Sequence, residues 1–280
     1  MSGLRSQRRR DGAIRAILLT AALTVFTLPL VWTALAAVGL RANNNTRPPS
    51  WIGSPTLDHF RDVGIAEPSF WQELATSTVS AACAAALTVA ASLPAAYGLA
   101  RSHFRGDRLL TQGFLVLASL PAMAYVIPLS DLMRRSQLVD TFAGLVLTEA
   151  AVTTPLAIYV LHGALTQLPD DWEEAAWLDG AGLLRVIGQI IVPLAAPNIA
   201  ATAIILFVLD WNLLLVPLVL TAGQIKTVPL AMIDFFTFER ELEWPTAAAA
   251  LIISLVPVAL LVMVFHRVLD RFALNVAQVD

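Results

Sequence analysis

The chain carries little charge and almost no cysteine or lysine. Of its 280 residues, 14% are charged and 57% are hydrophobic, whereas a soluble domain typically carries about 25% charged residues. This deficit excludes an ordinary water-soluble domain and places the chain among membrane proteins. The formal net charge of −3 gives no indication of a nucleic-acid partner.

The single cysteine, Cys83, stands inside an apolar run. A disulfide within the chain is therefore impossible, a cysteine-built metal site is not expected, and we expect Cys83 to be a small buried residue. The phosphate-binding pattern G-x-x-x-x-G-K-[ST] is absent, and the one lysine, Lys226, stands in GQIKT instead. The residues predict neither a metal nor a cofactor.

Long uncharged runs predict an all-α integral membrane protein, because a helix needs about 20 apolar residues to cross the hydrocarbon core. The predicted spans are about 16–40, 72–100, 109–130, 141–162, 198–221 and 244–266. The region 186–225 could hold two spans. Pro193 and Pro197 argue for one, because proline removes a helical hydrogen bond and clashes with the preceding turn.

The distribution of arginine predicts the orientation. The N-terminal segment 1–15 is basic, and so is the short link between the second and third spans. Positive charge near short loops marks the cytoplasmic side. We therefore expect both termini, the segment 163–197 and the tail 267–280 to be cytoplasmic, in a multi-pass protein of the bacterial cell membrane. The arginines of the link are Arg101, Arg105 and Arg108. Arg134 and Arg135 fall on the outer side, against the trend.

The polar segment 163–197 has helix signals of its own. Asp170 can cap a helix over about 171–178, with Glu173 three residues later as in a capping box. Gly180 then stands where a left-handed residue commonly ends a helix.

A second helix should begin near Gly182 and end at Pro193. Its apolar residues recur at a spacing of three to four, as on one face of a helix. These residues are Leu183, Ile187, Ile190 and Ile191. On the residues alone, a solvated loop on the membrane surface explains the segment as well as a functional helix pair does.

The stretch EAAWLDGAGLLRVIGQIIVP, residues 174–193, resembles the EAA motif of permease subunits of binding-protein-dependent ABC importers. The family pattern is E-A-A, three residues, G, nine residues, I, one residue, L-P. The matching positions are Glu174, Ala175, Ala176, Gly180, Ile190 and Pro193, with Val192 in place of the usual leucine.

Three further segments resemble the carbohydrate branch of that family, the maltose-permease-like second subunit. They are Asp179-Gly180-Ala181, AAYGLARSHFRGDR at 95–108, and the Trp211-Asn212 pair. Leu213 departs from the pattern, because an acidic residue often follows the W-N pair. The tail FALNVAQVD also departs, because relatives often end in a Gly-rich, Lys-containing tail, and this puts a contact between the tail and an ATPase in doubt.

The resemblance implies a type I ABC importer permease core of six helices, with a cytoplasmic coupling helix that docks on an ATPase. The residues that it assigns to coupling are Glu174, Ala175, Ala176, Asp179, Gly180 and Pro193. The implied partners are a second, non-identical permease, two ATP-binding subunits, an extracytoplasmic sugar-binding protein and membrane lipid. Since the phosphate loop is absent, ATP hydrolysis would fall to a separate subunit, and this chain would be a transport subunit rather than an enzyme.

Polar residues inside the predicted spans are the other candidates. Glu149, Asp210, Trp211 and Asn212 could line a translocation path, because ionisable groups within spans are functional candidates and sugars are commonly held by aromatic faces with polar partners. Interhelical hydrogen bonding explains the same residues.

Other functions compete with this one. An ion-coupled secondary transporter would use Glu149 and Asp210 as a proton relay, and an ABC permease of another branch would carry amino acids or peptides. An intramembrane enzyme would need Glu173, Glu174 and His162 as metal ligands or acid–base groups. The adjacent glutamates diverge by about 100° on a helix, and no H-E-x-x-H pattern occurs.

Overall fold

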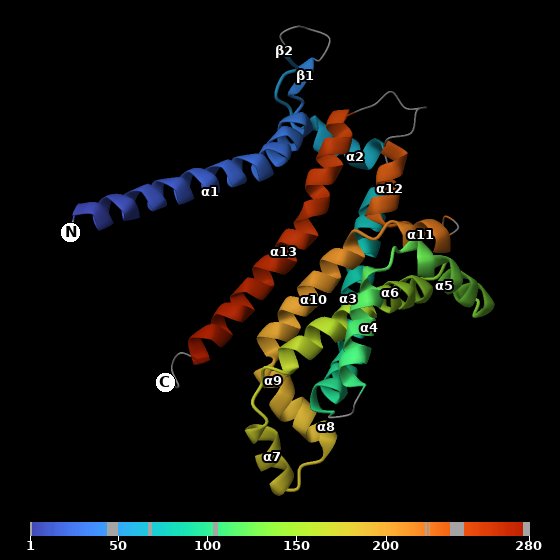
Figure 1. Ribbon diagram of the computed structural model, residues 1–280. Coiled ribbons are helices and arrows are strands. Elements are labelled where there is room, and N and C mark those ends of the chain that lie inside the picture. Colours follow the sequence, from blue (N-terminus) through green and yellow to red (C-terminus); the bar gives the residue numbers. More distant parts are fainter. Residues whose placement is uncertain are drawn as a thin grey trace. The chain divides into compact units, whose positions relative to one another are not determined.

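The computed structural model describes residues 2–43, 50–66, 69–102, 106–221, 223, 225–235 and 244–276 (Figure 1). Arg105 of the basic link and positions 277–280 of the tail lie outside the described residues. The chain forms two compact units, Met1–Ser69 with Phe235–Leu255, and Phe70–Asp234 with Val256–Asp280. The prediction of an all-α membrane fold is confirmed, with one short two-stranded hairpin added.

In the first unit, helix α1 (Ser2–Ala37) runs without a break from the basic N-terminal residues through most of the first predicted span. The large apolar side chains between Ile17 and Trp32 are exposed, as lipid-facing side chains are. The loop that follows forms an antiparallel pair, β1 (Arg41–Asn43) with β2 (Ser50–Ile52).

Two glycines bring the backbone together beside this hairpin. Gly39 has φ +86°, and a Cβ on Gly53 would lie 2.0 Å from the Gly39 carbonyl oxygen. Only glycine allows this approach. Helix α2 (Asp58–Ala66) follows, and the start of α13 (Trp244–Val276) adds the buried alanines Ala247, Ala248, Ala249 and Ala250.

The second unit is a bundle in which α3 (Phe70–Arg101) packs along both α6 (Phe142–Leu165) and α10 (Ala196–Trp211). Small side chains on α3 are buried and let these helices approach closely. They include Ser77, Ser80, Ala81, Ala84, Ala85, Thr88, Ser92 and Ala96. The Thr88 hydroxyl also lies 3.3 Å from the Ala150 carbonyl oxygen of α6.

The third predicted span, 109–130, does not form one continuous helix. It is divided into α4 (Asp107–Ser119) and α5 (Met123–Arg135), which are bent by 89°. Leu120 is extended, with φ −67° and ψ 143°, because a residue before proline is pushed out of the helical region and Pro121 follows it.

The fifth predicted span, 198–221, is also divided. Helix α10 ends at Trp211, and the short helices α11 (Leu215–Leu220) and α12 (Val228–Phe235) follow. By length and composition, the described residues contain four helices able to span a membrane, or six if each of two bent pairs is one span. The second pair is Leu183–Leu194 with Ala196–Trp211, bent by 81°.

The expectation that Cys83 is buried is wrong, because its side chain is exposed on α3. A membrane helix can turn an apolar residue outward to lipid as readily as inward, so hydrophobicity alone does not decide the face.

Candidate functional site

The first helix of the polar loop forms where the sequence places it. Helix α7 covers Asp171–Leu178, in agreement with the prediction. The capping box is wrong: Asp170 occupies the N-cap position, but its side chain makes no capping hydrogen bond. Its carboxylate lies 3.0 Å from Nη1 of Arg101 at the end of α3 instead. An ion pair with a distant helix therefore replaces the local cap.

Glu173 does not complete the predicted capping box either, because its carboxylate binds α3. The side chain is buried, with 1% of the residue exposed. Its Oε2 accepts a hydrogen bond of 2.7 Å from the Tyr97 hydroxyl. Its Oε1 accepts from Nε of Arg101 at 2.9 Å and from Nη2 at 2.6 Å. Both carboxylate oxygens are thus satisfied by α3, which a buried charge requires.

The same guanidinium reaches the segment that leads from α6 to α7. Nη1 of Arg101 donates to the carbonyl oxygen of Leu165 at 3.3 Å, and Nη2 donates to that of Leu168 at 3.4 Å. These carbonyls lie at and just beyond the C-terminal end of α6, where the helix itself provides no donor. Arg101 therefore binds the end of α6, the link and α7 at once.

The turn after α7 is built as predicted around Gly180, which has φ +81°. The Ala181 N–H donates to the carbonyl of Ala176 at 2.9 Å, and the Gly180 N–H donates to that of Trp177 at 3.0 Å. This pair of bonds is the Schellman motif, in which a left-handed residue closes a helix. Ala176 and Ala181 both pack on one apolar cluster, which is the hydrophobic contact that often accompanies the motif.

The second helix differs from its prediction in detail. It consists of α8 (Leu183–Val186), a wider π turn η1 (Ile187–Ile191) and α9 (Val192–Leu194). Pro193 lies inside α9, and the chain bends at Ala195 instead. A wider turn relieves the clash that the proline ring would make with the carbonyl four residues earlier.

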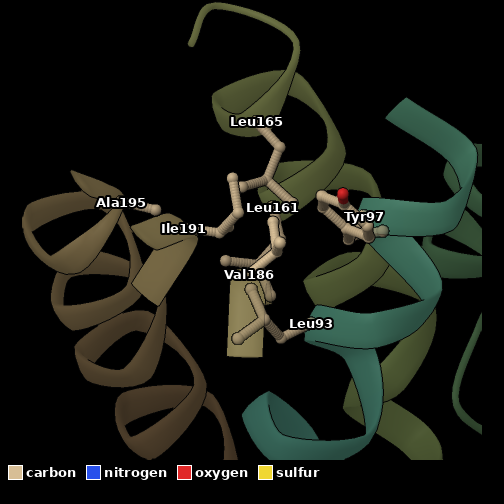
Figure 2. Packing of buried hydrophobic residues seen from close by; sticks show 8 residues of the cluster. Leu93, Tyr97, Leu161, Leu165, Val186, Ile191 and Ala195 are labelled. Carbon is tan, nitrogen blue, oxygen red and sulfur yellow. The ribbon is translucent and has the colours of Figure 1, made fainter. Parts of the chain in front are cut away.

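The buried face of this second helix joins α3 and α6. Val186, Ile191 and Ala195 face Leu93 and Tyr97 of α3 and Leu161 and Leu165 of α6 (Figure 2). Leu183, predicted on the apolar face, is exposed. The π turn shifts the helical phase, so a regular spacing of three to four misassigns the face.

The opposite face of the EAA segment, defined as residues 171–194, is open. Glu174 and Ala175 are exposed. They are accompanied by exposed apolar side chains, with Leu178 at 89% and Leu184 at 86%. Exposed apolar side chains of this size, next to a free charge, commonly mark an interaction site. Trp172, Trp177 and Leu183 are the other large apolar side chains exposed there.

The predicted residues within the spans lie in the interior of the bundle. Glu149 of α6 is 1% exposed and Asp210 of α10 is 2% exposed. In the described part of the chain, neither oxygen of Asp210 has a hydrogen-bond partner. Trp211 is buried and stacks on Phe207 at 5.9 Å between ring centroids.

Asn212 is separate from that group. It is exposed, and its Nδ2 donates to the Val208 carbonyl at 2.7 Å. His162 is half-buried in the last turn of α6. Within the described residues, no three His, Cys, Asp or Glu side chains come together as metal ligands.

The sequence did not point to Tyr97, Arg101 and Glu173 as a group. Tyr97 and Arg101 stand four residues apart, and so share a face near the end of α3. Glu173, the acidic residue directly before the E-A-A triplet, is the sequence feature that could have indicated a partner for Arg101. In the sequence, Arg101 is one of the basic charges that predict orientation, Tyr97 and Arg101 both belong to the family-like segment 95–108, and Glu173 is a predicted helix cap.

The helical bundle, the broken helices and the EAA segment with one buried and one exposed face define a multi-pass membrane protein. Residues 89–274 match the family described as binding-protein-dependent transport system inner membrane component, and the chain belongs to this family. The resemblance of the EAA segment to that family is therefore confirmed.

Known proteins are similar over most of the chain. It is 33% identical over 256 residues to the trehalose transport system permease protein SugB of Mycobacterium tuberculosis, covering 90% of this chain and 92% of that protein. It is 30% identical over 228 residues to the trehalose/maltose transport system permease protein MalG of Thermococcus litoralis, covering 78% and 82%. A chain of a bacterial ABC transporter involved in the import of the acidic polysaccharide alginate shares the fold, with a TM-score of 0.73, 19% identity and coverage of 92% and 96%.

Proposed function

We propose that this chain is the permease subunit of an ABC importer for a sugar, and that its EAA segment couples it to a separate ATPase subunit. The sugar assignment is supported by the trehalose and maltose named for its relatives. The family description supports an extracytoplasmic binding protein as the source of the solute. A second, non-identical permease and two ATP-binding subunits complete the assembly, with both termini of this chain in the cytoplasm.

The two-faced EAA segment is the observation that carries the coupling role. One face is held by Arg101 and by the apolar cluster of α3 and α6. The other presents Glu174, Leu178 and Leu184 to the surroundings. A segment fixed to the membrane helices on one side and open on the other suits a lever between two moving parts. Asp179 and Pro193 also lie on exposed positions of this segment.

Charge reversal of Glu174 tests this proposal. The tagged chain is co-purified with its partners in mild detergent, and ATP hydrolysis is measured on the recovered complex. Glu174→Lys should lose the ATPase subunit or its hydrolysis, because the exposed charge would contact that subunit. Asp131→Lys, an exposed reversal on α5, is the control for added charge. A Glu174→Lys complex with normal recovery and hydrolysis would contradict the coupling role.

The solute is tested separately, by uptake into proteoliposomes that hold the whole importer. Labelled trehalose and maltose should be accumulated with ATP inside and the binding protein outside. Accumulation of an amino acid or a peptide instead would contradict the assignment of a sugar as the solute, but it would leave the proposed coupling role intact.

For the residues within the spans, the burial of Glu149, Asp210 and Trp211 favours a role in helix packing over contact with a solute. Asn212 is the exposed member of the set and the one available to a solute. A proton relay would also use buried carboxylates such as Glu149 and Asp210, which keeps the ion-coupled secondary transporter as a second candidate.

A further inference from the structure

Arg101 is the point at which three separate segments meet. Its guanidinium contacts the Leu165 carbonyl at the end of α6, the Leu168 carbonyl in the link, and the carboxylates of Asp170 and Glu173 at the start of α7. Arginine suits this position because its planar group presents five donors in a fixed arrangement. Lysine would carry the charge without that geometry.

Glu173 is held from two sides by one helix. Tyr97 and Arg101 are one helical turn apart on α3, and each binds a different oxygen of the carboxylate. This fixes the rotation of α7 about its own axis as well as its distance from α3. The neighbour Glu174 is turned outward by the same rotation, since successive side chains on a helix point about 100° apart.

The link between α6 and α7 is short and exposed. Residues Thr166, Gln167, Pro169 and Asp170 are exposed, and Leu168 is half-buried. Without Arg101, the link would be free to absorb a displacement of α7. With Arg101 in place, α7 is tied to the end of α3 by side chains that come from 72 and 76 positions away in the chain.

We propose that Tyr97, Arg101 and Glu173 form a clamp that makes α7 and the end of α3 one mechanical unit. Movement of the docking face is then passed to α3 and is not lost in the link. These three are positioning residues, since they act through α7. The proposal rests on the coupling role proposed above, and it adds which transmembrane helix receives the movement and through which side chains.

The test measures sugar taken up per ATP hydrolysed by the assembled importer in proteoliposomes, with labelled trehalose as the probe. Glu173→Gln keeps the shape and the Tyr97 contact but loses the charge that binds Arg101. We expect the complex to assemble and hydrolyse ATP, with uptake per ATP reduced about 5-fold or more, the lower end of typical coupling effects. Tyr97→Phe should act in the same direction, and more weakly.

Two controls separate this result from a general defect. Asp131→Asn makes the matching acid-to-amide change in the exposed pair with Arg135, and it should leave the ratio unchanged. Arg101→Lys keeps the charge but not the geometry, and it should behave like Glu173→Gln. If the Glu173→Gln complex assembles and takes up as much sugar per ATP hydrolysed as the unchanged protein does, the proposed clamp is overturned.

A distance measurement gives an answer that does not depend on the sugar. Spin labels at Gly98→Cys on α3 and Asp171→Cys on α7, in a Cys83→Ala background, report the separation of the two helices. Both positions are exposed. The clamp predicts one narrow distance that ATP does not change in the parent, and a broadened distribution in Glu173→Gln. A parental distance that changes with ATP would overturn it, whereas failure to recover any ATPase subunit would overturn the coupling role itself.

Discussion

Glu173 and Glu174 are neighbours in the chain and have opposite environments. Glu173 is 1% exposed and bonded to Tyr97 and Arg101 of α3, whereas Glu174 is exposed. One step along a helix turns a side chain by about 100°, so a single pair of residues connects α7 inward to the bundle and outward to a partner.

Removal of Arg101 should strongly destabilise the protein. Arg101→Ala would leave Glu173 buried without its countercharge, and breaking a buried pair from one side costs about 3–5 kcal/mol. Arg135→Ala is the control, because its pair with Asp131 is exposed and such pairs contribute about 0–1 kcal/mol. Thermal unfolding in detergent measures both, and equal shifts would show that Arg101 is not an essential partner of Glu173.

Substitutions at Gly180 should depend on backbone conformation rather than on space. Gly180 has φ +81°, and nothing lies within 4 Å of an added Cβ. A left-handed conformation costs most side chains about 1–2 kcal/mol, and asparagine tolerates it better. Gly180→Val should therefore reduce uptake and recovery of the ATPase more than Gly180→Asn. Equal effects of the two variants would remove the backbone argument.

Two glycines of α6 should respond to alanine in opposite directions. A Cβ on Gly144 would lie 2.0 Å from the Leu138 carbonyl oxygen, while nothing lies within 4 Å of one on Gly163. Gly144→Ala should destabilise by about 1–3 kcal/mol, as overpacking does. Gly163→Ala should be neutral or stabilising by up to about 1 kcal/mol, because alanine favours the helix. Thermal unfolding of both variants measures the contrast, and a Gly144→Ala protein as stable as the parent would contradict the close contact.

The buried acids separate an ATP-driven importer from an ion-driven one. Asp210→Asn and Glu149→Gln keep the size of each side chain and remove the ionisable group. If the two acids serve only in helix packing, uptake should persist in both variants and should be insensitive to a protonophore as long as ATP is supplied. Uptake by the parent that collapses with the proton gradient, and that is lost in both variants, would instead indicate a proton relay.

Local sequence was sufficient where local forces decide the structure. The end of α7 and the turn at Gly180 follow from the one residue type that favours positive φ. The broken helix at Leu120 was also within reach, because Pro121 interrupts an otherwise apolar run. The hydrophobic length of 109–130 does not by itself reveal this break, whereas the effect of proline on the preceding residue does.

By itself, the sequence determined an all-helical membrane protein of the permease family, since long apolar runs and the spacing of the EAA segment are properties of the chain alone. Only the tertiary structure decided which glutamate faces the bundle, that Asp170 pairs with Arg101 rather than capping α7, and that Glu149 and Asp210 are both buried in the interior. The physical reason is distance along the chain. Glu173 and Arg101, for example, stand 72 positions apart in the chain, and the packing of helices that are distant in the sequence brings such residues together.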